Sequence, residues 1–159
     1  MPLLTPTFYE NHPAKAQTVL EVLLTGVDQS IATTLRDPDD GEAGWTILDI
    51  VCHLRDFEEL WQHRLARVLN EENPRFDPFD PNALVIQNDY ASQDFAAVWS
   101  ERTALRAASI AMLDAMTDSQ WDRTGIHARF GQITIVELKV QLPMHDLDHA
   151  EQITRILGL

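Results

Sequence analysis

The sequence predicts an all-α protein built as a four-helix bundle, and three observations lead to this prediction. Four segments carry apolar residues at steps of three or four along the chain, which is the period of a helix. No segment shows sustained alternation of polar and apolar residues with β-branched side chains, so no sheet is expected. The first and last connections are short and the middle one is long, as in a bundle with a crossover between its second and third helices.

The first helix is expected after Asn11, a favourable N-cap residue, with Pro13 in the opening turn. Its apolar stripe comprises Leu20, Leu23, Val27 and Ile31, with Leu35 as an optional last member. It is expected to end in the acidic loop of residues 37–44, which is rich in turn-forming residues.

The second helix is expected to begin at Thr46, which resembles a capping box with Asp49 in place of glutamate. It continues to about Asn70, with Ile47, Ile50, Leu54, Phe57, Trp61, Leu65 and Val68 at helical spacing. Three prolines between residues 71 and 91 exclude a regular helix there, so this stretch is interpreted as the crossover loop. A short helix over residues 82–89 is the alternative.

The third helix is expected from about Ser92, with the stripe Phe95, Val98, Arg102, Leu105, Ser109, Met112 and Met116. The fourth begins at Thr134, which forms a T-x-x-E capping box with Glu137. Its stripe is Ile135, Leu138, Leu142, His145, His149, Gln152 and Ile156. Gly158 stands where a helix stop is expected, and Pro143 within the helix predicts a kink one turn before His145.

Length, composition and net charge limit the classes of protein to which this sequence could belong. Residues 1–159 are of a length suited to one domain, and 12 basic against 25 acidic residues give a net charge of −13. That charge argues against nucleic acid and anionic membranes as partners, and solubility explains it simply. No apolar run is long enough to span a bilayer, and the first 15 residues do not resemble a signal peptide. The single cysteine, Cys52, fits a reducing, cytoplasmic location.

Three histidines occupy positions that favour a metal site. His145 and His149 lie four residues apart on the apolar stripe of the fourth helix, so both rings project from one face. His53 lies between Ile50 and Phe57 on the inward side of the second helix. A buried imidazole needs polar partners, and one divalent cation would serve all three rings. A three-histidine set that leaves a coordination position open is typical of catalytic zinc.

The string H-D-L-D-H invites comparison with the H-E-x-x-H helix of metalloproteases, and we reject that reading. Asp146 stands where those enzymes need a glutamate, and no strand pattern is available to bind a peptide substrate. A lone H-x-x-x-H pair is commonly a surface or core feature, so the prediction depends on His53 as the third ligand.

Several carboxylates near the proposed ligands have two interpretations. Asp49, Asp56, Asp146 and Asp148 could orient an imidazole N–H or act as a base, but for most of them an ordinary charge on the helix surface is favoured. Asp56, Asp146 and Arg102 are the candidate catalytic residues. Arg102 interrupts an apolar stripe, so it either extends to solvent or reaches the pocket to bind an anionic group.

The remaining histidines are weaker candidates. His63 points about 80° from His53 on an ideal helix, at roughly 100° per residue. His12 and His127 are expected in terminal or loop segments. Cys52 is interpreted as a small buried apolar residue.

Three segments together resemble the DinB/YfiT-like superfamily of proposed metal-dependent enzymes, which is unrelated to the DNA polymerase of that name. WTILDIVCHLRDFE resembles its second helix, and WSERTALRAASIAML its third, with an arginine at the position of Arg102. GQITIVELKVQLPMHDLDHAEQI is similar to its last helix, with H-x-x-x-H followed by Q-I. The resemblance covers roughly residues 10–157, while the prolines at 74–81 and Pro143 depart from the usual pattern.

This resemblance implies an up-down-down-up bundle, a homodimer, and a zinc or nickel ion held by His53, His145 and His149. Some relatives transfer low-molecular-weight thiols such as bacillithiol or mycothiol, and one branch isomerises maleylpyruvate conjugates. The hypothesis is therefore a metal-dependent enzyme that activates a thiol or water for a small-molecule substrate, as a thiol S-transferase or hydrolase. The alternatives are a non-catalytic protein that binds metal or a small ligand, and an interaction module with structural histidines.

Overall fold

The computed structural model describes residues 11–41 and 44–159. The expectation about a signal peptide concerns residues 1–15, of which 1–10 lie outside the described residues. Residues 42 and 43 of the acidic loop also lie outside them. The main helices are α1 (His12–Leu23), α3 (Ile47–Asn70), α5 (Phe95–Asp114) and α6 (Ile135–Leu157). The shorter elements are α2 (Gln29–Thr34), α4 (Pro81–Gln87), the 3-10 turns η3 (Tyr90–Ser92) and η4 (Asp118–Gln120), and the strands β1 (Thr124–His127) and β2 (Gly131–Thr134).

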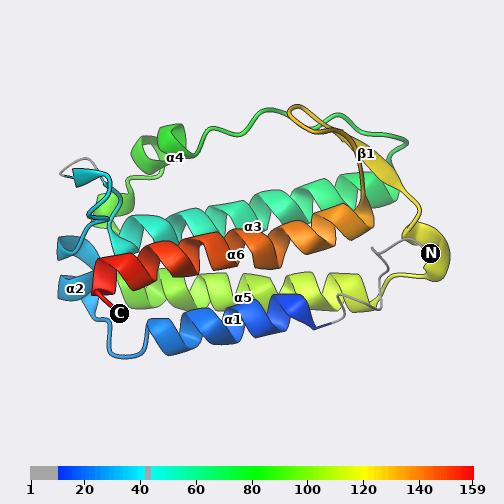
Figure 1. Cartoon of the computed structure of the whole chain (residues 1–159). Coiled ribbons are helices and arrows are strands. Elements are labelled where there is room, and N and C mark those ends of the chain that lie inside the picture. Colours follow the sequence, from blue (N-terminus) through cyan, green and yellow to red (C-terminus); the bar gives the residue numbers. More distant parts are fainter. Residues whose placement is uncertain (1–10, 42–43) are drawn as a thin grey trace.

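The four long helices form the predicted bundle in up-down-down-up order. In Figure 1, α3 and α5 run in one direction, and α1 and α6 run in the other. The most extensive helix contacts join α3 to α5 and α1 to α6, which are the parallel pairs, and α3 also packs along α6. The crossover from α3 to α5 returns the chain to the starting end of the bundle, as predicted. Among the described residues, no helix is both long and apolar enough to cross a membrane.

The prediction of one continuous first helix is wrong. The chain leaves α1 after Leu23, passes through Gly26 at φ +82°, and starts α2 with Asp28 as N-cap, whose side chain accepts the Ile31 N–H. Apolar residues on both sides of this turn happen to share a helical period, so the pattern hid the break. Asn11 occupies the N-cap position of α1 without a side-chain bond, and Leu35 lies 38% exposed outside α2.

The starts of α3 and α6 confirm the two predicted capping boxes. Thr46 accepts the Asp49 N–H while Asp49 accepts the Thr46 N–H, and Thr134 and Glu137 make the same pair of bonds. Gly158 closes α6 in the left-handed conformation, as predicted. Such end contacts fix where each helix begins, and so which side chains face inward.

The crossover contains α4, the short helix of the alternative interpretation. Asp80 caps it, Pro81 opens it, and it ends at Gln87. The third helix of the bundle, α5, begins at Phe95 rather than Ser92, because the Asp94 side chain accepts the Ala97 N–H.

The prediction of no sheet is wrong, because β1 and β2 form a short antiparallel hairpin before α6. Each strand has four residues, too few to show a period of two. The backbone of the hairpin also forms hydrogen bonds with the crossover: Ile126 donates to Pro74 and accepts from Phe76. Gly125 allows this close approach, since a Cβ there would lie 2.6 Å from the Phe76 ring.

Two apolar clusters fill the bundle, one at each end. Leu20, Ile50, Leu54 and Ile153 belong to the first, and Trp61, Leu65, Leu138 and Leu142 to the second. The Trp61 indole N–H donates to the Leu138 carbonyl at 2.7 Å and ties α3 to α6. The polar residues of α3 and α6 described next lie between these clusters.

Candidate metal centre

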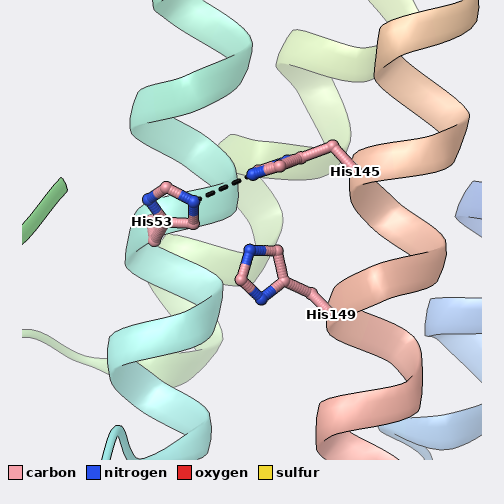
Figure 2. Close-up of side chains that lie close together, drawn as sticks. All are labelled: His53, His145 and His149. Carbon is pink, nitrogen blue, oxygen red and sulfur yellow. Dashed lines mark hydrogen bonds between the residues drawn. The ribbon is translucent and has the colours of Figure 1, made fainter. Parts of the chain in front are cut away.

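His53, His145 and His149 converge in the space between α3 and α6, as the sequence predicted. His53 comes from α3, while His145 and His149 come from successive turns of α6 (Figure 2). The three ring centroids lie 4.7–4.9 Å apart in every pairing. His53 is only 4% exposed, whereas His145 and His149 are half-buried.

The ring nitrogens are placed so that one cation could contact all three residues. The Nε2 atoms of His53 and His145 lie 2.9 Å apart, and one ligating nitrogen from each of the three histidines lies within 4.8 Å of the others. His149 Nδ1 lies 2.9 Å from Gln152 Oε1. Because an amide oxygen only accepts, Nδ1 of His149 carries the proton and Nε2 keeps its lone pair for a ligand.

Aromatic side chains enclose this cluster. Phe57 stacks on His145 with ring centroids 3.8 Å apart, and Phe79 lies 5.9 Å from His53. Trp45 is nearly parallel to His149, at 9° and 6.2 Å, and lies 5.0 Å from His53. The rings are thus held in apolar surroundings, where a charged imidazole is unfavourable and a coordinated cation interacts strongly with its ligands.

Burial keeps the three imidazoles neutral. It lowers the pKa of His53 to about 3 and that of His145 to about 2, and any protonation of His149 would lower both further. Burial also lowers the pKa of His149, against an opposing effect of the bond to Gln152. A neutral imidazole is the form that binds a metal, so the three rings are in a form that could bind a cation at neutral pH.

The donor set fits a divalent transition metal. Imidazole nitrogen suits zinc, nickel, copper and iron, and three such ligands leave at least one coordination position for another molecule. Among the described residues, the cluster of metal-ligating side chains at this point consists of the three histidines alone. The arrangement resembles open catalytic sites more than closed structural ones.

Asp146 follows His145 directly but faces α5 rather than the ring. Its two carboxylate oxygens accept from Arg102 Nη2 at 2.7 Å and from Arg106 Nη1 at 2.6 Å. Arg106 also donates to both oxygens of Glu58 on α3, at 2.9 and 2.7 Å. All four side chains are at most 2% exposed. We call these four residues the charge network.

The charge network connects α3, α5 and α6 beside the histidines. Burial opposes the charge of Arg106, but the hydrogen bonds that Arg106 donates to Glu58 and the charge of Asp146 raise its pKa, so it stays ionised. Arg102 is fully buried and bound to Asp146, and so does not extend to solvent. Arg106 and Glu58 were not singled out from the sequence, although Arg106 lies one turn after Arg102 on the same helix face.

Asp56 binds the crossover instead of a histidine. Its carboxylate accepts from Tyr90 at 2.6 Å, Asn88 at 2.7 Å and Arg55 at 2.9 Å. The surface-charge interpretation is therefore wrong for Asp56 and Asp146, which are 8% and 2% exposed. In contrast, Asp148 is exposed.

The side chain that orients an imidazole is Gln152, which the sequence indicated only as a member of the α6 stripe. Its position three residues after His149, on the same helix face, was the available signal.

The other histidines lie away from this cluster. His63 is exposed, His12 opens α1 and is half-buried, and His127 ends β1. Cys52 is fully buried in the apolar cluster next to His53 in sequence, and burial raises its pKa to about 12. It therefore behaves as the small apolar residue that was expected.

The sequence profile of the DinB superfamily matches residues 10–153. The chain belongs to the DinB superfamily. This assignment agrees with the bundle order and with the placement of the histidines on the second and last long helices, α3 and α6.

Individual relatives are similar over most of the chain. "Putative metal-dependent hydrolase YfiT" from Bacillus subtilis is 28% identical over 153 residues, which is 94% of this chain and 82% of that protein. The solved structure of YfiT matches with a TM-score of 0.76 at 21% identity, over 99% of this chain and 87% of that one. A mycothiol-dependent maleylpyruvate isomerase matches with a TM-score of 0.78 at 13% identity. That match covers 94% of this chain but only 61% of the isomerase, and it establishes the shared fold.

The charge network gives a first prediction. Asp146→Asn keeps the side-chain shape but leaves two buried guanidinium groups with a single carboxylate, Glu58. The free energy of unfolding should fall by about 3–5 kcal/mol, as when one partner of a buried ion pair is removed. Urea denaturation measures this. Asp148→Asn makes the same charge change at an exposed position and should stay within about 0.5 kcal/mol of the parent. Equal losses in the two variants would contradict the role of the network.

The buried imidazoles give a second prediction, for the metal-free protein. Below pH 6.5 the unfolded chain protonates its histidines, while folded His53 and His145 stay neutral down to about pH 3 and 2. The unfolded state then binds more protons, so stability falls as pH falls. Between pH 6 and 4, His53 and His145 each add up to about 1.4 kcal/mol per pH unit to this slope. Urea titrations with chelator should show a shallower slope for His145→Leu than for the parent, and no change for exposed His63→Leu. A parental slope in His145→Leu would contradict the burial of this ring as a neutral group.

Proposed function

We propose that the protein is a metal-dependent enzyme in which His53, His145 and His149 hold one divalent cation. The observation that carries this proposal is the convergence of three neutral imidazoles from two helices, with no carboxylate or thiolate completing the cluster among the residues described. A bound divalent ion of this kind lowers the pKa of water or a thiol and so supplies a nucleophile at neutral pH.

The protein's own groups would orient and shield this chemistry. Gln152 sets the tautomer of His149, and the stacked Phe57 holds the plane of His145. Aromatic rings on several sides limit access of bulk water. Asp56 and Asp146 have their carboxylates in bonds to other residues, so in this proposal they position the crossover and α6. They do not serve as the base.

The reaction is either hydrolysis or transfer of a thiol to a small electrophile. The name of the YfiT relative favours a hydrolase, and the name of the mycothiol-dependent isomerase, which shares the fold, favours thiol chemistry. All three proposed ligands come from one chain, so a homodimer is compatible with the site without being needed to complete it. Zinc and nickel are the proposed ions, since both accept imidazole ligands.

A non-catalytic metal-binding protein is the second candidate. The 4% exposure of His53 and the enclosing aromatic rings favour it, because a ligand needs a route to the ion in order to react. If the histidines were purely structural, neither metal content nor chelation would affect the protein.

The metal content of untagged protein tests the site directly. We expect about one ion per chain in the parent by elemental analysis. His53→Ala and His149→Ala should each lose at least ~10-fold in metal affinity, since each removes a ligand. His63→Ala, an exposed histidine on the same helix as His53, should keep the parental content. Parental metal content in both ligand variants would remove the basis of the proposal.

Turnover separates the enzyme from the binding protein. The substrates are small esters and amides, together with low-molecular-weight thiols offered with electrophilic acceptors. We expect a rate that chelation abolishes, that added zinc or nickel restores, and that His149→Ala lacks. A protein that binds metal stoichiometrically but turns over none of these substrates would support the binding candidate instead.

A further inference from the structure

A pocket of about 340 Å³ lies beside the histidine cluster and shares two aromatic walls with it. Phe57 and Phe79, which contact His145 and His53, line this pocket as well. The hairpin tip supplies the opposite wall through His127, Arg129 and Phe130. Its volume is within the range of small-molecule sites. The pocket is thus formed by α3, the crossover, the hairpin tip and α6.

Arg64 on α3 is a buried cation in this wall with no carboxylate partner among the residues described. It is 4% exposed, and its Nε atom is buried without a hydrogen-bond partner. Its guanidinium has a weak bond, 3.4 Å long, from Nη2 to the Asp77 carbonyl. One face of the guanidinium lies over the Phe76 ring at 5.3 Å. Burial lowers the pKa of Arg64, and no neighbouring anion offsets this effect.

The contrast with the charge network shows that this arrangement is unusual within the same protein. Arg106, equally buried, has its guanidinium bonded to both Glu58 and Asp146. A buried charge without a partner is costly, and proteins generally pair it unless a ligand does so. Arg64 therefore lacks an anion that would satisfy both its charge and its free donor.

The pocket is locally positive in a strongly acidic chain. Two arginines, Arg64 and Arg129, line it against one acidic residue, Asp77, while the whole chain carries a net charge of −13. Apart from burial, the charges of these two arginines lower the pKa of His127, so all three groups share one region. Such a local reversal of sign attracts an anionic ligand and repels cations.

We propose that this pocket binds a carboxylate at Arg64, in a small organic acid whose apolar part packs between Phe57, Phe79 and Phe130. The planar guanidinium matches a carboxylate through parallel N–H donors. This deepens the proposed function and rests on it, because the other end of the same molecule would reach the histidine cluster.

The spacing constrains the shape of that acid. His53 and Arg64 are eleven residues apart on one helix, about 16 Å along its axis at 1.5 Å per residue. In this proposal the carboxylate and the reacting group therefore lie toward opposite ends of the substrate, with an apolar segment between them. A short acid with its reactive group adjacent to the carboxylate would not span the two sites.

Calorimetric titration of the metal-loaded protein with 4-phenylbutyrate and with its neutral amide, 4-phenylbutyramide, tests the proposal. The parent should bind the acid at least ~10-fold more tightly than the amide, since a charged carboxylate accepts a stronger hydrogen bond than a neutral amide does. Arg64→Gln should bind both equally. Arg67→Gln, which removes a half-exposed arginine already paired with Glu71, should keep the parental preference. Equal binding of acid and amide by the parent, or an unchanged preference in Arg64→Gln, would overturn the assignment.

A second variant guards against a simple folding defect. Arg64→Met removes a buried unpaired charge while keeping an apolar stem, so without ligand its melting temperature should match or exceed that of the parent. A large fall in melting temperature would instead show that Arg64 is a structural residue.

Inorganic phosphate is the competitor that tests the class of anion. Displacement of 4-phenylbutyrate by phosphate at equal concentration would overturn the choice of a carboxylate.

The proposed anion site and the proposed metal site can be tested independently of each other. The preference for the acid should persist in chelator-treated protein and in His149→Ala, because Arg64 does not depend on the cation. If metal binding fails and this preference remains, the proposed function is wrong while the pocket assignment stands. If metal binds but the preference is absent, the pocket assignment fails alone.

Discussion

The bonds that Asp146 accepts from Arg102 and Arg106 help to fix how α6 is rotated about its own axis. Asp146 faces α5, so the preceding His145 and the later His149 are directed toward α3, where His53 projects. Glu58 extends the same contacts to α3. The buried apolar stripe of α6 turns the same face inward, and the directional bonds to Asp146 act together with it to orient the rings. The geometry of the histidine cluster thus depends on a charge network that itself touches no ligand.

The part of the site that could be predicted from sequence is the part encoded by local period. His145 and His149 fell on the apolar stripe of a well-capped helix, and His53 occupied an inward position on another, so their burial followed from spacing alone. Their convergence needed the additional assumption of a bundle. The charge network could not be foreseen, because an aspartate one residue from a histidine carries no signal that its partner lies on a different helix.

The misjudged elements have a similar explanation. A break at Gly26 was hidden because the apolar residues on both sides kept the helical period, and the period reports burial rather than continuity of the backbone. The hairpin was missed because four-residue strands are too short for alternation, and their stability comes from contact with Phe76 and the crossover. The sequence did not indicate that Arg64 is buried without an anionic partner, since this is visible only when the surrounding side chains are known.

Together, the cluster and its neighbouring pocket form a site with distinct ends. One end offers neutral nitrogen donors that favour a cation, the middle offers aromatic walls, and the far end offers an unpaired guanidinium that favours an anion. Membership of the DinB superfamily and the relation to YfiT support metal chemistry, and the pocket narrows the shape of the molecule that could take part.

X-ray absorption spectroscopy of the zinc-loaded protein tests the central claim most directly. The account predicts a first shell that contains three imidazole nitrogens at about 2.0–2.1 Å, with the outer-ring scattering of histidine and at least one further light atom. A first shell without imidazole scattering, or one that contains the sulfur of Cys52, would contradict it.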